Sequence, residues 1–409
     1  MKPLLRSLAL LVLVTLTACQ QSSGSTPTQP SATTPAPATD SPASTDELVI
    51  DGLDVTLVTD RVAVPREVIT VDDRSLVLDQ LGAVWVLEDG KVGKKPFLDI
   101  RSEVLQPSGE ALELGLAGLA LAPDFAESGV LYTFSTAPPR KSDDAEVERI
   151  DVITRWRADP ETLVLDQKSA QEIWSYPRTF LDHVGGELVF DDDGLLHAAV
   201  GAETSSEEAQ DPNSFAGSIL RFDPEDEKPE PEVFSYGYRN PFRMTWDAEV
   251  GLVVSEPMFT EKDSQVSVPE PGGNAGYPLL SGELDSCWAD GGGLDPRCEK
   301  TESGEPLVPP VLEYPRDIGQ IVSGAFIYRS ERIPELTGKA IVADWYGTLM
   351  VASPGEAPWA YRIWQPPAQD LAPSSLLWDI GTDDHGIVYL MRVEQGMQEG
   401  QLYAIDRRS

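Results

Sequence analysis

Basic residues are scarce in this chain. Its 409 residues include 31 lysines and arginines against 68 aspartates and glutamates, so the formal net charge is −37. A surface this acidic repels phosphate backbones, which excludes nucleic acid as an expected partner. The acidity suits solubility and divalent cations, although most of these carboxylates need no role beyond keeping the exterior hydrated.

Long apolar runs are also missing. The most apolar segment, Leu8 to Leu16, covers about nine residues, which is too short to cross a bilayer as a helix. It follows a positively charged start and ends in Leu-Thr-Ala-Cys19, a pattern typical of bacterial lipoprotein signal peptides. We therefore expect a signal peptide over 1–19, lipidation of Cys19, and an extracytoplasmic protein that contacts a cell membrane or outer membrane through this anchor only. An ordinary secretory signal with a chance cysteine is the alternative.

The segment after the signal peptide lacks large apolar residues. Residues 20–46 are mostly Ser, Thr, Pro, Ala and Gln. Such a segment buries too little surface to offset the entropy lost on ordering, so we expect a disordered tether. The remaining stretch, 47–409, is too long for one small core and suits either two domains or one large all-β domain.

Cysteine is rare, with three residues in the whole chain. If Cys19 carries lipid, Cys287 and Cys298 remain as a pair within one Gly-rich loop. In an exported chain this pair predicts one local disulfide. Two thiols without nearby histidines are a poor zinc site.

Helical periodicity is nearly absent, and a hairpin pattern takes its place. An apolar strand, an Asp-containing turn, a glycine and a second apolar strand recur around Gly129, Gly194, Gly251 and Gly386. Successive glycines are 65, 57 and 135 positions apart, and we interpret residues 83–90 as an earlier copy. A period near sixty corresponds to one four-stranded blade, so the pattern predicts an all-β, six-bladed β-propeller of antiparallel blades over 47–409. A β-sandwich is the alternative architecture, but sandwiches rarely repeat one hairpin so often.

Two polar segments border probable strands. Asp-His183-Val-Gly-Gly runs into an apolar stretch, and Tyr-Gly-Tyr-Arg239-Asn240-Pro-Phe follows about fifty residues later. In this order and spacing they resemble the glucose/sorbosone dehydrogenase family, the quinoprotein sugar dehydrogenases built on a β-propeller. Further segments of the chain resemble the blade-specific segments of that family: 97–100, 115–120, 217–223, 272–278 and 323–329.

The resemblance implies roles for individual residues. His183 would be the general base that removes a proton from a sugar hydroxyl while hydride passes to pyrroloquinoline quinone (PQQ), a task for which imidazole is suited. Arg239 would stabilise developing negative charge, and Arg239 and Asn240 would bind the cofactor. The structural alternatives are a histidine that caps a strand in a polar pocket and an arginine that braces blade loops through backbone carbonyls.

The chain departs from the family pattern where cofactor contacts are expected. Leu114 stands in place of a glutamine, and the stretch 374–380 has no cation where the family has arginines. PQQ carries three carboxylates, and burying them unpaired is prohibitive, so another loop cation such as Arg316, Lys339 or Arg329 would be needed.

A calcium site is the second expectation from the resemblance, and it also looks reduced. Asp263 is present as a calcium ligand, but Gln265 and Ser267 occupy the positions of an acid and an amide. Their oxygens carry less charge and would bind calcium more weakly.

Two functions from different classes follow from the sequence. The first is a PQQ-dependent oxidoreductase that oxidises a sugar or related alcohol outside the cytoplasm, with calcium as a second cofactor. The alternative is a non-catalytic surface propeller that binds a carbohydrate or a protein. The number of cations around His183 distinguishes them.

Overall fold

The computed structural model describes residues 43–408, except 110, 204–205, 225, 227–228, 258–263, 281–286, 288–292, 302–303, 368–374 and 395. Cys19 and Asp263, two of the predicted site residues, lie outside the described residues. In the part of the chain that is described, no helix is long and apolar enough to cross a membrane.

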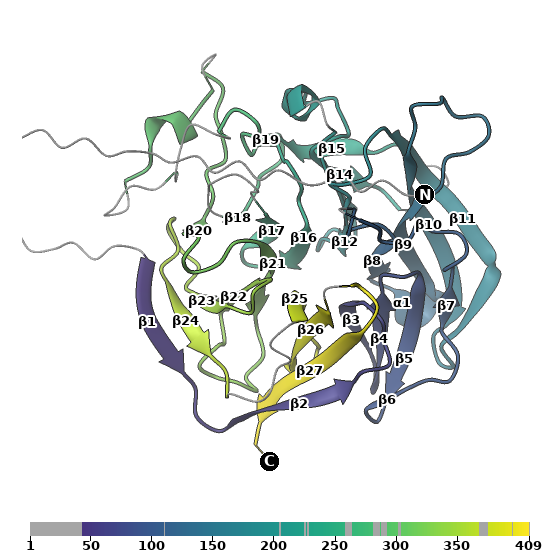
Figure 1. Ribbon diagram of the computed structural model, residues 1–409, viewed down its shortest axis with the longest axis horizontal. Coiled ribbons are helices and arrows are strands. Elements are labelled where there is room, and N and C mark those ends of the chain that lie inside the picture. Colours follow the sequence, from purple (N-terminus) through teal and green to yellow (C-terminus); the bar gives the residue numbers. More distant parts are fainter. Residues whose placement is uncertain are drawn as a thin grey trace, which may run out of the picture. The chain divides into compact units, whose positions relative to one another are not determined.

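Six small sheets of four or five strands form a six-bladed β-propeller, as the repeat predicted (Figure 1). The first strand of each blade contacts the first strand of the next blade, and the first strand of the sixth blade contacts that of the first blade, which closes the ring. These six strands therefore line a central channel, and the other strands of each blade follow outwards.

Each blade is made almost entirely of consecutive strands. The blades comprise β3 (Pro65–Val71), β4 (Arg74–Asp79), β5 (Ala83–Glu88), β6 (Lys91–Val92) and β7 (Leu98–Asp99); β8 (Leu116–Leu121), β9 (Val130–Ala137), β10 (Arg149–Asp159) and β11 (Val164–Arg178); β12 (Gly185–Phe190), β13 (Leu196–Val200), β14 (Ser218–Phe222), β15 (Glu232–Tyr236) and β19 (Gly273–Asn274); β16 (Arg243–Asp247), β17 (Gly251–Glu256), β18 (Ser264–Ser267) and β20 (Leu312–Tyr314); β21 (Val322–Tyr328), β22 (Lys339–Asp344), β23 (Leu349–Ala352), β24 (Tyr361–Gln365) and β1 (Ala43–Val49); and β25 (Ser375–Thr382), β26 (Val388–Glu394), β27 (Gly400–Arg407) and β2 (Leu53–Thr59). The described residues also include three short helical segments: α1 (Phe125–Ser128), η1 (Ser206–Gln210) and η2 (Pro296–Cys298).

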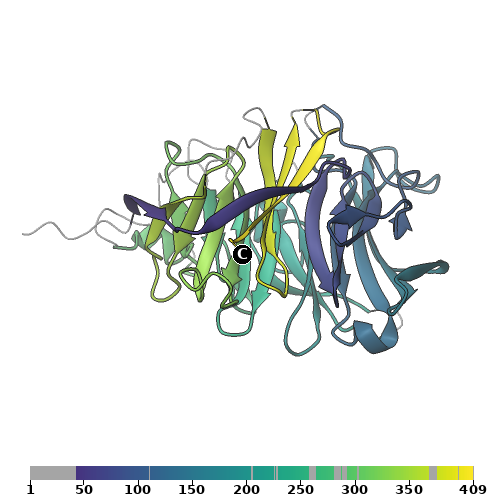
Figure 2. The same ribbon diagram turned by 90° about the horizontal axis from the view of Figure 1, so that it is seen from below.

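The last blade is completed by a strand from near the start of the described chain. β2 pairs antiparallel with β27, and Leu53 lies opposite Arg407. The preceding strand, β1, pairs in parallel with β24 of the neighbouring blade and begins at Ala43, four residues before the predicted tether boundary. Figure 2 shows this purple segment crossing the side of the two blades.

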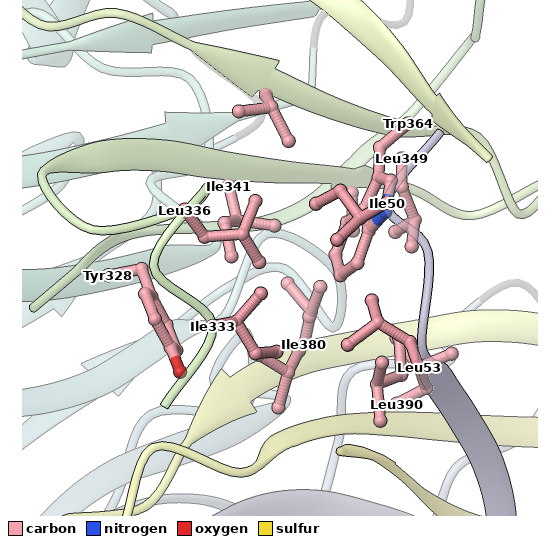
Figure 3. Close-up of a cluster of buried hydrophobic side chains, with 14 of the residues drawn as sticks. Ile50, Leu53, Tyr328, Ile333, Leu336, Ile341, Leu349, Trp364, Ile380 and Leu390 are labelled. Atoms are coloured by element: carbon pink, nitrogen blue, oxygen red, sulfur yellow. The ribbon is translucent and has the colours of Figure 1, made fainter. Parts of the chain in front are cut away.

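Apolar side chains from the two bridged blades hold that segment in place. Ile50 and Leu53 are buried in one cluster with Trp364 of β24 and Leu390 of β26 (Figure 3). Burying a side chain of this size contributes about 1.5–3 kcal/mol. Packing and strand pairing therefore act together to close the ring.

The predicted hairpin glycines occupy the turns between the first and second strands of four blades. Gly129, Gly194, Gly251 and Gly386 all have positive φ, which glycine adopts at little cost. The prediction that residues 83–90 form a further copy of this hairpin was wrong, because their turn joins the third and fourth strands of a blade. An Asp-Gly turn marks any tight hairpin, so the signal does not distinguish the position of the hairpin within a blade.

Cys287 and Cys298 form a disulfide in the structure, with their Cα atoms 5.8 Å apart. Both are buried, and partly buried Leu280 and Leu294 pack against them. The bridge spans 11 positions of a long connection between β19 and β20.

Candidate functional site

His183 lies just before β12, at one end of the channel, and its backbone has an unusual conformation. Its φ is +55°, a region that non-glycine residues rarely occupy. The main-chain carbonyls of Asp182 and His183 accept hydrogen bonds from the Arg149 guanidinium, at 2.8 and 3.2 Å. The next amide, that of Val184, donates to the Glu113 carboxylate at 2.9 Å. A strained backbone conformation persists where surrounding contacts fix it, and the hydrogen bonds from Arg149 and to Glu113 fix this one.

Gly186, the second of the two glycines after His183, is explained by packing between blades. A Cβ on Gly186 would lie 2.3 Å from the Cβ of Ala117, and one on Gly118 would lie 2.2 Å from the Gly186 carbonyl oxygen. The first strands of two blades thus approach too closely for side chains at these positions. Gly186 and Gly118 together allow the close approach of the two blades next to His183.

A buried ion-pair network supports the His183 segment from the neighbouring blade. Arg149 and Arg178 both pair with Asp151 at 2.8 Å, and Arg178 also pairs with Glu203. Arg149 and Arg178 are fully buried, and Arg178 additionally donates to the Gly201 carbonyl at 2.7 Å. Buried charges of this kind are tolerated only when paired and hydrogen-bonded, so the network is a rigid support.

The imidazole of His183 is buried and neutral over the physiological range. Burial lowers its pKa to about 3, and the nearby Arg239 guanidinium contributes to the lowering, whereas an interaction with the backbone of Ala202 opposes it. Its Nδ1 atom has no hydrogen-bond partner among the described residues. The Phe180 ring packs edge-on against the imidazole, with centroids 5.0 Å apart. The Nδ1 atom of His183 is therefore a buried nitrogen whose hydrogen-bonding capacity no described residue uses.

Arg239 and Asn240 are brought to the same place from the loop between β15 and β16. The Ala202 amide donates to the Arg239 carbonyl at 2.8 Å, and the Arg239 guanidinium donates to Pro257 at 3.4 Å. The main-chain amides of Arg239 and Asn240 both donate to Glu256. Arg239 is partly exposed at this end of the channel.

Asn240 has no exposed surface and links three blades. Its carbonyl oxygen accepts from the Gly185 amide at 3.1 Å, and its amide nitrogen donates to Glu113 at 2.7 Å. Burial raises the pKa of Glu113, and the nearby Asp182 adds to the rise. These contacts give Asn240 a positioning role in the structure, next to the His183 segment.

The predicted calcium ligands that the structure describes have protein partners. The side-chain amide of Gln265 donates to Glu256 at 2.9 Å, and Ser267 interacts with the hydroxyl of Tyr238. Burial also raises the pKa of Glu256. No group of three or more acidic, histidine or cysteine side chains within the described ranges is arranged to hold a metal ion.

Below the mouth, the channel contains charged side chains and a cavity of about 300 Å³. Arg243 bridges Glu187 and Asp379 and also donates to the Arg66 carbonyl. This arginine therefore braces the channel. Glu67 lines the same cavity, and burial together with the nearby Glu187 raises its pKa well above the usual value.

Aromatic side chains occupy the region where the family pattern has cations. Trp378 is fully buried and stacks on Trp345 with centroids 4.7 Å apart, and Phe242 packs edge-on against it at 5.8 Å. The Trp378 indole nitrogen donates to Gln80 at 2.9 Å. Leu114 is likewise buried in an apolar cluster between blades.

Two of the three proposed replacement cations, Arg329 and Lys339, lie at the far end of their blade. Arg329 follows the end of β21 that lies away from His183 and pairs with Asp247 at 2.6 Å. Lys339 begins β22 at that same far end and donates to Ser353 at 3.0 Å. Arg316 is exposed in the connection from β20 to β21.

The residues at the mouth fit PQQ in part. The unpartnered Nδ1 atom of His183 suits a general base, and the partly exposed Arg239 suits a partner for one carboxylate of the cofactor. Arg66, the next cation inward, is fully buried and donates to Gln80 and to the Gly185 carbonyl, both at 3.2 Å. Next to His183, the partly exposed Arg239 is thus a candidate partner for one of the three carboxylates of this cofactor, whereas Arg66 is enclosed by the protein.

Comparison with known proteins identifies the family of this chain. Residues 62–352 match the family model described as glucose / sorbosone dehydrogenase. The hedgehog-interacting protein of Mus musculus is 24% identical over 370 residues, covering 81% of this chain and 49% of that protein. The aldose sugar dehydrogenase YliI of Escherichia coli strain K12 is 27% identical over 240 residues, covering 56% of this chain and 61% of that protein. The chain spans about half or less of the length of the first curated relatives that it matches.

Solved structures agree on the fold. The apo form of a soluble aldose sugar dehydrogenase from Escherichia coli has a TM-score of 0.66 at 19% identity, with 87% of this chain and 100% of that chain covered. The PQQ-bound form of an aldose sugar dehydrogenase from Streptomyces coelicolor has a TM-score of 0.60 at 20% identity, with 87% and 98% covered.

Proposed function

Because the chain belongs to the glucose/sorbosone dehydrogenase family, we propose that it oxidises a sugar or a related alcohol at the channel mouth. The observation that carries this proposal is the neutral, buried imidazole of His183 with an unpartnered Nδ1 atom. A buried ring nitrogen without a partner is costly, and a substrate hydroxyl that donates to it would remove that cost.

In this proposal His183 and Arg239 have separate tasks. The Nδ1 atom of His183 accepts the proton of the substrate hydroxyl, and the Arg239 guanidinium stabilises the negative charge that develops on the oxygen. An anion paired with Arg239 would cancel part of the field that lowers the pKa of His183, and so would bring the base closer to its working range. Asn240, Glu113 and the Arg149 network keep the His183 segment in place.

PQQ is the proposed cofactor and calcium the proposed metal. When bound, PQQ would supply the hydride acceptor, and Arg239 would pair with one of its carboxylates. The proposal for calcium rests on Gln265 and Ser267 together with Asp263, which lies outside the described residues. The proposal for PQQ is supported by the family and by the PQQ-bound neighbour from Streptomyces coelicolor.

We also propose an extracytoplasmic location with a lipid anchor at Cys19. The support is the Leu-Thr-Ala-Cys pattern after a short apolar run. A substrate outside the cytoplasm would then reach the channel without crossing a membrane.

A second candidate is a non-catalytic propeller that binds a carbohydrate or a protein. Buried Leu114 and Trp378 favour it, because they place packed apolar groups where the family pattern has polar cofactor contacts. A relative named for interaction with hedgehog covers 81% of this chain, which also supports a binding role.

Titration of the purified chain with PQQ and calcium, followed by absorbance, separates the two candidates. Saturable binding at micromolar cofactor together with sugar-dependent dye reduction supports the oxidoreductase. In that case His183→Ala should lower the rate by about a hundred- to ten-thousand-fold while cofactor still binds. His385→Ala is the matched control, because His385 is exposed in a turn of another blade and its loss should leave the rate unchanged. An absence of saturable binding would refute the oxidoreductase.

A further inference from the structure

A second cleft lies between the second and third blades, at the end of the propeller opposite to His183. Its volume is about 730 Å³, within the usual range for small-molecule sites. Phe190, the last residue of β12, lines it, whereas His183 precedes the first residue of the same strand. Six residues of β-strand span about 20 Å, so the cleft is separate from the channel mouth.

Two arginines of β10 lie in this cleft. Arg155 and Arg157 are two positions apart on one strand and therefore point to the same face. The residue between them, Trp156, points the other way and is buried in the cluster toward the preceding blade. On the neighbouring strand β9, Tyr132 lies directly opposite Arg155 and Val130 lies opposite Arg157.

Neither arginine forms an ion pair with a carboxylate that the structure describes. The Nε atom of Arg155 is moreover buried without a hydrogen-bond partner. Arginines near the same end of other blades are paired: Arg221 with Glu232, Arg329 with Asp247 and Arg332 with Asp406.

This arrangement is unusual because acidic residues outnumber basic ones by 68 to 31 in the chain. Nearby acids would be expected to pair with two adjacent arginines. Unpaired guanidiniums in a cleft favour an external carboxylate or another oxyanion, which they bind through two parallel hydrogen bonds.

The rest of the lining narrows the chemistry of the ligand. Tyr132 and Phe190 form an aromatic wall with ring centroids 5.7 Å apart. Asp124, Asp193 and Asp223 also line the cleft, and carboxylates accept hydrogen bonds from hydroxyl groups. A site with two adjacent guanidiniums, an aromatic wall and hydroxyl acceptors matches a ligand that has one carboxylate and several hydroxyls.

We propose that this cleft binds an acidic carbohydrate, a uronate or an aldonate, whose carboxylate is held by Arg155 and Arg157. The ligand's hydroxyls face the aspartates, and its apolar face lies against the aromatic wall. The site is independent of the proposed oxidation at His183.

Isothermal titration calorimetry of the purified full chain tests the proposal, with glucuronate and gluconate as probes. At least one of them should bind saturably, whereas glucose should not, and rising salt should weaken binding because the contact is charged. Arg155→Gln and Arg157→Gln should each weaken binding about tenfold or more. Arg140→Gln is the matched control, since Arg140 is an exposed arginine at the other end of the same blade that already pairs with Glu172, and it should leave affinity unchanged.

Other results would overturn the proposal. If inorganic phosphate or sulfate binds as tightly as glucuronate, the cleft is a simple oxyanion site. If glucose binds as tightly, the arginines do not select the ligand. If neither acidic sugar binds at millimolar concentration, or if the arginine variants bind them normally with an unchanged melting temperature, the assignment is wrong.

Discussion

The buried imidazole of His183 should make the stability of the protein depend on pH in a defined way. Its pKa is about 3 in the folded protein, against about 6.5 in an unfolded chain. Above pH 6.5 neither state is protonated and the group adds no pH dependence. As the pH falls below 6.5, only the unfolded state takes up the proton, so folding stability decreases until the pH reaches the folded pKa.

The size of the effect follows from the shift. Each pH unit within that window corresponds to about 1.4 kcal/mol, so lowering the pH from 7.5 to 5.0 should remove about 2 kcal/mol through His183 alone. His183→Gln keeps a similar volume but does not titrate. The free energy of unfolding of the variant should therefore fall by about 2 kcal/mol less than that of the parent over the same pH interval.

Urea unfolding at the two pH values measures this difference. The raised pKa values of Glu113 and Glu256 act in the opposite direction, since those groups favour the folded state at low pH. They are present in both proteins and cancel when the parent and the variant are compared. Equal losses for His183→Gln and the parent would show that the imidazole is not buried as described.

Four further outcomes are expected. Cys287→Ser opens a disulfide loop of 11 positions and should lower the free energy of unfolding by about 2–3 kcal/mol; two free thiols per purified parent chain would rule out the bridge. Gly201→Ala places a Cβ 2.2 Å from the His183 carbonyl oxygen, so the melting temperature should fall, and a parental value would contradict the packing. Arg178→Met leaves two buried carboxylates without this cation and should cost about 3–5 kcal/mol in urea unfolding. Cys19→Ala should leave an unprocessed or released protein, and a membrane-bound product of parental mature mass would exclude the anchor.

The fold was predictable because the repeat is local. An apolar strand, a turn with a positive-φ glycine and a second strand are encoded within about a dozen residues, and Gly194 and Gly251 mark equivalent turns of successive blades. The same local signal misled at 83–90, because a tight turn does not reveal which pair of strands it joins.

The site was predictable only where a motif carries it. His183 and Arg239 come from separate motifs, and the structure brings them together through Ala202. The supporting residues Arg149 and Arg178 were missed, since they lie on strands of the preceding blade and have no local pattern. Their role arises from tertiary contacts with main-chain carbonyls, which a single sequence does not encode in a recognisable form.

The pairing of Leu53 with Arg407 has a consequence for folding. The final blade lacks one of its four strands until residues about 350 positions apart have met, which is a contact of very high sequence separation. Such contacts slow folding. Before they form, the strands that lack a partner have open edges, and these edges can pair with other chains. We therefore expect a chain truncated before β27 to aggregate, whereas the full-length chain shields both edges of that gap.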